Sequence, residues 1–458
     1  MIDTQAIRTR ILHLALQGKL VPQNSSDDSA IDLVSALCKK IKGQSFQNNI
    51  SQQEIPYDIP DSWVWCHLSD IGTTNIGLTY HPEDVSANGT IVARSSNIVN
   101  NKMDYTDLVK VTCPIRDNQF LHTHDILICA RNGSKALVGK CAIFEGTPKT
   151  VAFGAFMAVF RTPLYRFVYY YFNSQVFKRN FFNDESKQIN QVTQSILKKS
   201  LIPIPPMQEQ ERITRKIEQA FSILDTIDEL QAQYAENITA LKSKLIDAAI
   251  RGKLTEQLPE DGTAEELYQQ IQEEKQKPLP EIFDEKIPFD IPDNWKWVRF
   301  SDVLDVRDGT HDTPKYVNEG IPLVTSKNLK DGQIDYSSAK LISNEDAEMI
   351  NRRSLVDDGD ILLAMIGTIG NPVLVKKDRN FCIKNVALFK PVNPNLLDMM
   401  YVLFYLIFEQ YVMREKARGG LQPFVSLTIL RKTIFPLPPL AEQKRIVQKL
   451  EQILPLCE

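Results

Sequence analysis

Ile202-Pro-Ile-Pro-Pro-Met-Gln-Glu-Gln-Glu-Arg-Ile213 decides the fold, because this stretch occurs twice. Its second copy is Phe435-Pro-Leu-Pro-Pro-Leu-Ala-Glu-Gln-Lys-Arg-Ile446, at a shift of 233 in the numbering. We call this stretch the exit block. An internal repeat determines the architecture before any single helix or strand is considered. The chain therefore contains a duplicated unit, whose extent follows from the sequence on either side.

Two further blocks repeat at nearly the same spacing. The opening block, Ile55-Pro-Tyr-Asp-Ile-Pro-Asp-Ser-Trp-Val-Trp65, recurs at a shift of 232 as Ile287-Pro-Phe-Asp-Ile-Pro-Asp-Asn-Trp-Lys-Trp297. The glycine block, Gly18-Lys-Leu20, recurs at a shift of 234 as Gly252-Lys-Leu254. The chain of 458 residues is therefore two copies of one unit that spans about half its length.

A long helix follows the first exit block. Proline is tolerated at the start of a helix, and Gly252 is placed to end it. In between, apolar residues recur in alternating steps of four and three, interrupted by Gln231: Ile213, Ile217, Ala220, Leu224, Ile227, Tyr234, Ile238, Leu241, Leu245 and Ala248. This seam predicts a coiled coil of roughly 55 Å at 1.5 Å per residue. An amphipathic helix lying on a globular core is the alternative.

The repeat also predicts the organisation of the rest of the chain. Met1 corresponds to Ala235 and Glu458 to Asp225, so both termini fall inside a second copy of the long helix. We therefore expect a pseudo-twofold molecule whose termini lie close together. The predicted segments are a helix at 1–21, a linker at 22–54, a globular domain at 55–204, the central helix at 205–257, a linker at 258–286, a second globular domain at 287–437 and a helix at 438–458.

Both globular domains are predicted to be α+β. Short β-rich runs lie at 90–94, 125–130 and 155–161, and at 321–325, 360–366 and 386–390. An aromatic helical stretch closes each domain, at 165–182 and at 397–418. The fold class is therefore α+β, with two similar domains joined by long coiled-coil helices. The tryptophans of the opening blocks are expected in the cores.

The charge is unevenly distributed along the chain. The net charge is −4. Residues 76–200 carry 15 basic and 9 acidic residues, and residues 300–434 carry 17 of each. Residues 208–297 carry 11 basic and 20 acidic residues. The globular domains thus keep enough Lys and Arg for phosphate contacts. The acidic connecting segment is a solvated face or a surface for a basic partner.

Several classes of protein are disfavoured by the sequence. Seven cysteines without a CxxC pair indicate reduced thiols in a cytoplasmic protein and no zinc site. The longest apolar run, 399–408, is too short to span a membrane. There is no GxxxxGK[ST] loop, no HExxH and no Asn/Asp-Pro-Pro-aromatic motif. The alternatives are a stand-alone DNA methyltransferase or nuclease, and a coiled-coil protein scaffold.

Both domains carry residue types that read DNA bases. Arg and Lys suit guanine, and Asn and Gln suit adenine. The candidates in the first domain are Arg94, Ser96, Asn97, Arg131, Asn132, Lys135, Gln188 and Asn190. The candidates in the second domain are Arg307, Thr310, His311, Thr313, Ser326, Lys327, Asn328, Thr368 and Gln422. For each, a solvated or phosphate-only role is the alternative. No Cys or His cluster accompanies His311, which disfavours a catalytic or metal role.

The repeated blocks resemble the specificity subunits of type I restriction–modification systems. The resemblance rests on the glycine, opening and exit blocks, on Asp360-Ile-Leu-Leu-Ala-Met-Ile-Gly-Thr-Ile-Gly370 and on Gly309-Thr-His-Asp-Thr-Pro314. It covers essentially the whole chain. The first domain has His124-Asp-Ile126 in place of Gly359-Asp-Ile361 and lacks the Gly-Thr-His loop, so contacts implied by the family carry over less directly there.

This resemblance implies a division of labour among several chains. Each globular domain would be a target recognition domain that reads one half of a bipartite site in double-stranded DNA. The helices would space the domains and dock two modification (methyltransferase) subunits, and the resemblance allows two restriction subunits. No catalytic residue, metal or cofactor is expected on this chain. S-adenosylmethionine, ATP and magnesium are expected on the partners.

The geometry of DNA adds two expectations. Two readers on one face of a duplex are expected about one helical turn apart, roughly 34–36 Å. Changing the central helix by a heptad should therefore change the gap between half-sites. Because the loops of the two domains differ, the two half-sites should differ as well.

Overall fold

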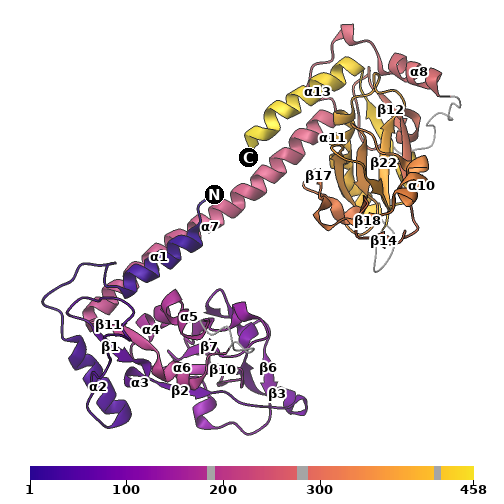
Figure 1. The fold of residues 1–458 in the computed structure, drawn as a ribbon. Helices are drawn as coiled ribbons and strands as arrows, with labels where there is room; N and C mark the ends of the chain where they lie inside the picture. Colours follow the sequence, from indigo (N-terminus) through magenta and orange to yellow (C-terminus); the bar gives the residue numbers. More distant parts are fainter. Residues whose placement is uncertain (183–190, 276–286, 417–423, 458) are drawn as a thin grey trace. The chain divides into compact units, whose positions relative to one another are not determined.

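The chain forms two units, which are described separately. The structure is a computed structural model that describes residues 1–182, 191–275, 287–416 and 424–457. The contacts divide the chain into Met1–Ala232 and Gln233–Glu458. Figure 1 traces the chain through both units.

Unit 1 is built around two sheets and an antiparallel strand pair. The central sheet has the order β2-β10-β7-β8, with strands Thr73–Ile76, Met157–Arg161, Ile126–Cys129 and Cys141–Ile143. The second sheet has the order β6-β3-β9, with strands Val109–Val111, Val85–Ala93 and Val151–Phe153. A short hairpin joins β4 (Ile98–Val99) to β5 (Lys102–Met103). The pair of β1 (Val64–His67) with β11 (Leu201–Ile204) brings the two ends of the domain together.

Unit 2 repeats this arrangement. Its central sheet has the order β13-β22-β19-β20, with strands Leu304–Asp308, Val386–Pro391, Ile361–Ala364 and Gly370–Leu374. Its second sheet, β14-β18-β15-β21, has strands Tyr316–Val317, Lys340–Ile342, Ile321–Val324 and Cys382–Ile383. The hairpin consists of β16 (Leu329–Lys330) and β17 (Gln333–Ile334), and the closing pair of β12 (Lys296–Arg299) and β23 (Ile434–Leu437). The predicted duplication and the α+β class are confirmed; β14 is a separate strand, whereas in unit 1 the corresponding Val85 pairs with β6 as the first residue of β3.

Helices pack against the sheets of each unit. In unit 1 they are α3 (Leu68–Ile71), α4 (Tyr165–Phe172), α5 (Gln175–Phe182) and α6 (Gln194–Lys199). In unit 2 they are α9 (Phe300–Val303), α10 (Asn344–Ser354), α11 (Met399–Lys416) and α12 (Leu427–Lys432). The aromatic stretches predicted as helical supply fully buried rings, among them Tyr171 and Tyr401. Each of these two tyrosines donates its hydroxyl to a backbone carbonyl of its unit's closing strand.

Three helices, α1 (Thr4–Leu16), α7 (Met207–Ile250) and α13 (Leu440–Ile453), form the frame. In unit 1, α1 lies antiparallel along α7, because Thr4 contacts Asp228 whereas Arg8 contacts Asp225. Leu12 and Leu16 join Ile213 and Ile217 in the core of unit 1. In unit 2, α13 lies along the last turns of α7, where Ile446 and Leu450 join Ile246 and Ile250 in the core. Within each unit the central helix is therefore paired as expected, with α1 in unit 1 and with α13 in unit 2 (Figure 1).

The predicted seam of the central helix is correct only in part. Ile213, Ile217 and Leu224 are buried as predicted, and Ile227 and Ile238 are half-buried. Leu241 is 45% exposed, which corrects its assignment to the seam. Near the end of α7 the buried residues are Ile246, Ala249 and Ile250, whereas the seam continues through Leu245 and Ala248. A straight helix drifts about 20° per heptad from a seven-residue repeat, so five heptads displace the contact face by about one residue.

Both segments predicted as linkers contain a helix. Helix α2 (Ala30–Lys42) buries Ala30, Val34 and Cys38, with Ser29 as N-cap and a left-handed Gly43 after its last turn. Helix α8 (Ala264–Glu274) begins with a capping box. The two segments are mostly polar, so composition alone does not indicate these short amphipathic helices, whereas their capping residues do.

Candidate nucleic-acid interface

In unit 1, several strands of the central sheet end at one place. Arg131 follows β7 and forms an isolated antiparallel bridge with Gln191. The backbone N–H of Arg131 donates to the carbonyl of Phe156 at 3.0 Å, in the turn before β10. Ile76, the last residue of β2, pairs with the neighbouring Ala158. We call the set Ile76, Arg131, Phe156 and Gln191 the recognition edge of unit 1.

This edge forms a shallow depression with mixed chemistry. Its volume is about 300 Å³, and its lining includes the whole recognition edge together with Gln194. Phe156 is 62% exposed and Ile76 is 50% exposed. The Arg131 guanidinium lies 5.8 Å from the centre of the Phe156 ring. The Arg131 side chain is exposed, and no ion pair of it occurs among the described residues.

The loop at 94–97 stands beside this edge. Asn132 donates to the Ser95 hydroxyl at 3.1 Å, which links the loop to the end of β7. Arg94 is ion-paired with Asp107 at 2.8 Å. Asn97 is only 1% exposed; its amide oxygen accepts from the Arg94 N–H and its amide nitrogen donates to two backbone carbonyls. Asn97 therefore holds the loop in shape, which corrects its assignment as a base reader.

Unit 2 has an equivalent recognition edge. Ile366 follows β19 and forms an antiparallel bridge with Phe424, as Arg131 does with Gln191. Asp308 ends β13 and pairs with Ala387, as Ile76 pairs with Ala158. Two residues, Lys384 and Asn385, lie in the turn between β21 and β22, and Asn385 directly precedes β22. We call Asp308, Ile366, Asn385 and Phe424 the recognition edge of unit 2.

The Gly-Thr-His loop supplies polar groups to the edge of unit 2. His311 contacts the Asp308 carboxylate through Nε2 at 2.7 Å and the Asn385 amide oxygen through Nδ1 at 3.0 Å. The backbone of Thr310 forms an isolated parallel β-bridge with that of Lys384. The ammonium group of Lys384 contacts the Thr313 hydroxyl. The side chains in this cluster are exposed or half-buried, except for that of Asp308, which is buried.

Two second-domain candidates serve the fold. Asn328 is 2% exposed and repeats the role of Asn97, because its amide oxygen accepts from the Thr325 N–H and its nitrogen donates to the Asp335 carbonyl. It is therefore corrected from base reader to structural residue. Arg307 is half-buried, paired with Asp305, and donates to the Arg353 carbonyl at 3.1 Å. The side chains of Asn328 and Arg307 therefore both have hydrogen-bond or ion-pair partners within unit 2.

Apart from the buried Asn97 and Asn328, the candidates fall into three groups by exposure. Ser96, Arg131, Lys135, His311, Thr313, Lys327 and Thr368 are exposed. Arg94, Asn132, Arg307, Thr310 and Ser326 are half-buried. Gln188, Asn190 and Gln422 lie outside the described residues. The sequence does not reveal the apolar edge residues, because residue types that read bases are hydrogen-bonding ones. It does not reveal Gln194, Lys384 and Asn385 either, because only the fold places them at the edge.

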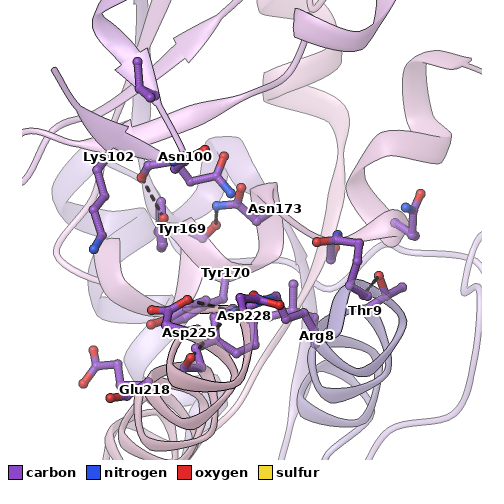
Figure 2. Close-up of a pocket in the computed structure, with 18 of the residues that line it drawn as sticks. Arg8, Thr9, Asn100, Lys102, Tyr169, Tyr170, Asn173, Glu218, Asp225 and Asp228 are labelled. Atoms are coloured by element: carbon purple, nitrogen blue, oxygen red, sulfur yellow. Dashed lines mark hydrogen bonds and ion pairs between the residues drawn. The ribbon is translucent and has the colours of Figure 1, made fainter. Parts of the chain in front are cut away.

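Another depression in unit 1 lies where α1, α7, α4 and the β4–β5 hairpin meet (Figure 2). Its volume is about 930 Å³, and its polar lining includes Arg8, Lys102 and Tyr169. Arg8 is already paired with Asp225 and Asp228. Tyr169 donates to the Asn101 carbonyl at 2.9 Å. None of the recognition-edge residues lines this depression.

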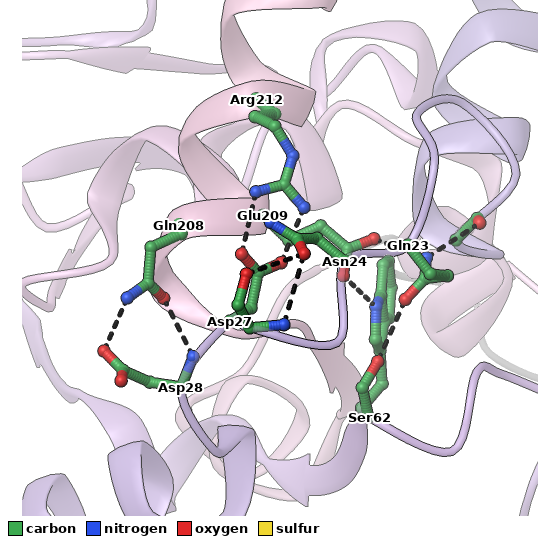
Figure 3. Close-up of polar contacts among 11 residues, drawn as sticks. Gln23, Asn24, Asp27, Asp28, Ser62, Gln208, Glu209 and Arg212 are labelled. Carbon is green, nitrogen blue, oxygen red and sulfur yellow. Dashed lines mark hydrogen bonds and ion pairs between the residues drawn. The ribbon is translucent and has the colours of Figure 1, made fainter.

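The repeated blocks form a different site, which we call the frame joint (Figure 3). In unit 1 the Glu209 carboxylate is fully buried and accepts from the Trp63 indole N–H at 2.9 Å and from the Gln23 amide at 2.6 Å. Burial raises the pKa of Glu209, opposed by these two hydrogen bonds. Arg212 pairs with Asp27 at 2.6 Å and holds the pKa of that carboxyl below its ordinary value.

The same frame joint recurs in unit 2. Glu442 accepts from the Trp295 indole at 2.8 Å and from Gln257 at 2.9 Å. Arg445 pairs with Asp261 at 2.5 Å and lowers the pKa of that carboxyl. The opening, exit and glycine blocks therefore repeat because they meet in space. Their role is to fix each domain to its helix, and it involves no DNA-reading group.

Other classes of site were also sought in the described residues. Within those ranges, no group of three or more His, Cys, Asp or Glu is arranged to hold a metal ion. All seven cysteines are free thiols. Within the same ranges, no helix is both long and apolar enough to cross a membrane.

The fold and its edges define a duplicated recognition protein: two copies of one α+β domain, each fixed to a helix and each presenting different side chains at the same edge. Comparison with known proteins supports this description of a duplicated recognition protein. The family model described as "Type I restriction modification DNA specificity domain" matches residues 60–236 and 292–456. The chain belongs to this family, and it is a type I restriction–modification specificity subunit.

Relatives and solved structures support this assignment over the full length. The EcoAI specificity subunit of Escherichia coli is 25% identical, over 98% of this chain and 89% of the relative. The EcoKI specificity subunit of E. coli K12 is 24% identical, over 86% and 82%. The fold is similar to that of a chain in a structure of a type I restriction–modification system, with a TM-score of 0.61 and 19% identity over 88% of this chain and 92% of that one. It is also similar to the HsdS subunit from Thermoanaerobacter tengcongensis, with a TM-score of 0.50 and 19% identity over 88% and 91%.

Proposed function

We propose that the chain reads a bipartite, asymmetric sequence in double-stranded DNA, one half through each recognition edge. The observation that carries this proposal is that the two edges occupy equivalent places in the two units but hold different side chains. One backbone scaffold with exchanged readers changes which base is preferred without changing how the domain sits on DNA. Identical edges would instead specify two equal half-sites.

We propose further that all chemistry resides on partner chains. The frame helices would dock two modification subunits, which would bind S-adenosylmethionine and methylate adenine. In systems that cleave DNA, restriction subunits would bring ATP and magnesium. Buried Trp63, Glu209 and their counterparts in unit 2 support this role, since they hold the domains to the helices that partners would grip. The free thiols fit a cytoplasmic protein.

Selection from a randomised duplex library, using the chain assembled with its modification partners, tests the reading function. We expect a consensus of two unlike half-sites separated by a fixed gap. Arg131→Ala should relax at least one position in one half-site and leave the other half unchanged. Lys40→Ala, an exposed change on α2, should leave the whole consensus unchanged.

Two results would contradict the proposal. The first is a wild-type complex that selects no consensus. The second is transfer of methyl groups from S-adenosylmethionine to DNA by the chain alone, which would establish a stand-alone methyltransferase. Uniform weakening of every sequence by Arg131→Ala would reduce Arg131 to a phosphate contact.

A further inference from the structure

The two recognition edges carry polar and apolar side chains in exchanged places. The first place is the bridge beside α6 in unit 1 and α12 in unit 2. In unit 1 it holds Arg131 and Gln191, whereas in unit 2 it holds Ile366 and Phe424. The backbone is the same at both, since the next residue donates to the same carbonyl: Val192 to Ala130 at 2.8 Å, and Val425 to Met365 at 3.0 Å.

The second place is the turn between the two sheets of each unit. In unit 1 it is apolar, with Ile76 at the end of β2 and Phe156 before β10. In unit 2 it is polar, with Asp308 at the end of β13 and Asn385 before β22, and His311 contacting both. The hydrogen-bonding place of one unit is therefore the apolar place of the other.

The exposed aromatic rings are not explained by the cores. Phe156 is 62% exposed and Phe424 is 46% exposed, although the residues that follow them, Met157 and Val425, are both buried. In unit 1 the Phe156 ring lies in the same depression as Arg131 and Gln191. An apolar surface placed beside base-reading donors matches the major groove, where the C5-methyl of thymine lies next to the hydrogen-bonding edges of neighbouring bases.

We propose that each edge reads a thymine methyl group beside a purine edge, and that the order of the two contacts is reversed between the units. In unit 1, Phe156 and Ile76 contact the methyl group, and Arg131 and Gln191 bind the purine. In unit 2, Phe424 and Ile366 contact the methyl group, and the cluster of His311, Asn385 and Lys384 binds the purine. This inference rests on the proposed function, and it specifies bases that the proposed function does not.

Replacing single thymines by deoxyuridine tests this proposal, because it removes the methyl group alone. The probes are duplexes of the consensus selected by the wild-type complex with its modification partners, with one thymine changed at a time. Burial of one methyl-sized group corresponds to about a fourfold change in affinity. We expect wild type to lose about fourfold at one thymine in each half-site.

The variants assign each thymine to a unit. Phe156→Ala should bind thymine and deoxyuridine equally at the sensitive position of one half-site only, and Phe424→Ala at that of the other. Arg131→Lys keeps the charge but loses the two-pronged donor geometry, so it should lose purine selectivity while the salt dependence of binding is retained. Ile31→Ala and Ile287→Ala, which change exposed apolar side chains away from the edges, should retain the wild-type pattern.

The outcomes separate this inference from the proposed function. If the wild-type complex selects a bipartite consensus but both phenylalanine variants keep its deoxyuridine pattern, the inference is overturned and the proposed function stands. The inference is likewise overturned if Phe156→Ala or Phe424→Ala prevents assembly with the modification subunits, because the ring would then be a protein contact. A wild-type complex without any consensus contradicts the proposed function itself.

Discussion

Glu209 of the exit block binds Trp63 of the opening block and Gln23, which lies three residues after the glycine block. One carboxylate oxygen accepts from the Trp63 indole N–H and the other from the Gln23 amide, so both donors need the Glu209 carboxylate as their acceptor. A buried donor left without its acceptor costs about 1–3 kcal/mol. The strict recurrence of Glu in both exit blocks is thus a requirement of the frame joint.

Glu209→Gln tests that requirement at constant side-chain volume. Glutamine offers one acceptor and one donor, so one of the two donors that face Glu209 loses its partner. We expect a loss of about 1–3 kcal/mol, measured as a lower Tm for unit 1. Glu442→Gln should act equally on unit 2. The change Lys216→Ala, at an exposed residue of α7, should cost far less, and wild-type stability in Glu209→Gln would contradict the role assigned here.

The ion pair of the same joint predicts a pH dependence. Arg212 holds the pKa of Asp27 below the ordinary value of 3.8. A carboxyl whose pKa is lower in the folded chain adds stability above its unfolded pKa, and this stability is lost as the pH falls through the folded pKa. Asp27→Asn should therefore be less stable than wild type at pH 7, and the difference should shrink below about pH 4. Unfolding midpoints between pH 7 and 3 measure it; a constant difference would count against the pair.

At the scale of elements, the end of α1 is set by a glycine that has no room for a side chain. Gly18 has a φ of +69°, and a Cβ there would lie 2.4 Å from Pro60 Cγ. Gly252 repeats this against Pro292 at 2.3 Å. The glycine block therefore seats the helix end directly on the opening block.

Comparison with a third glycine separates crowding from backbone strain. Gly43, after α2, has nearly the same φ of +70°, but a Cβ added there would meet nothing within 4 Å. Gly43→Ala should cost about 1 kcal/mol for the left-handed backbone alone. Gly18→Ala should cost clearly more, because the proline must also move. Equal Tm losses in the two variants would show that the contact with Pro60 is unimportant.

The sequence predicted these elements unevenly, for physical reasons. The repeat, the frame helices and the end of α7 at Gly252 were readable, because periodicity and capping are local signals. Helices α2 and α8 are not evident from the sequence although their caps are present, because short polar segments also make up linkers. At the interface, Arg131 was found by residue type. Phe156 and Phe424 were not, since only the folded chain shows that an apolar side chain is left exposed. Asn97 and Asn328 were misassigned for the converse reason: burial cannot be read from an Asn in a loop.

At the scale of the whole molecule, α7 is one continuous helix of 44 residues that begins in unit 1 and ends in unit 2. Its length is therefore the natural measure of the gap between half-sites. The expected closeness of the two termini involves both units and stays a prediction.

A seven-residue insertion in the exposed stretch around Tyr234 tests this measure. It lengthens the helix by about 10.5 Å and turns its faces by only about 20°. We expect the selected consensus to keep both half-sites and to gain roughly three base pairs between them, at about 3.4 Å each. A five-residue insertion, which turns the faces by about 140°, should instead abolish binding to either spacing. An unchanged gap after the heptad insertion would contradict the role of the helix as a spacer.

The pairing of β1 with β11 has a consequence for how such chains change over generations. Because the strands at the two ends of the first domain pair with each other, the chain enters and leaves that domain at neighbouring positions. Genetic exchange with breakpoints in those strands would transplant a complete reader and leave Trp63 and Glu209 to re-form the same junction. A lineage that carries such a gene would then acquire a new DNA target by one exchange of this segment, without altering its methylating enzyme.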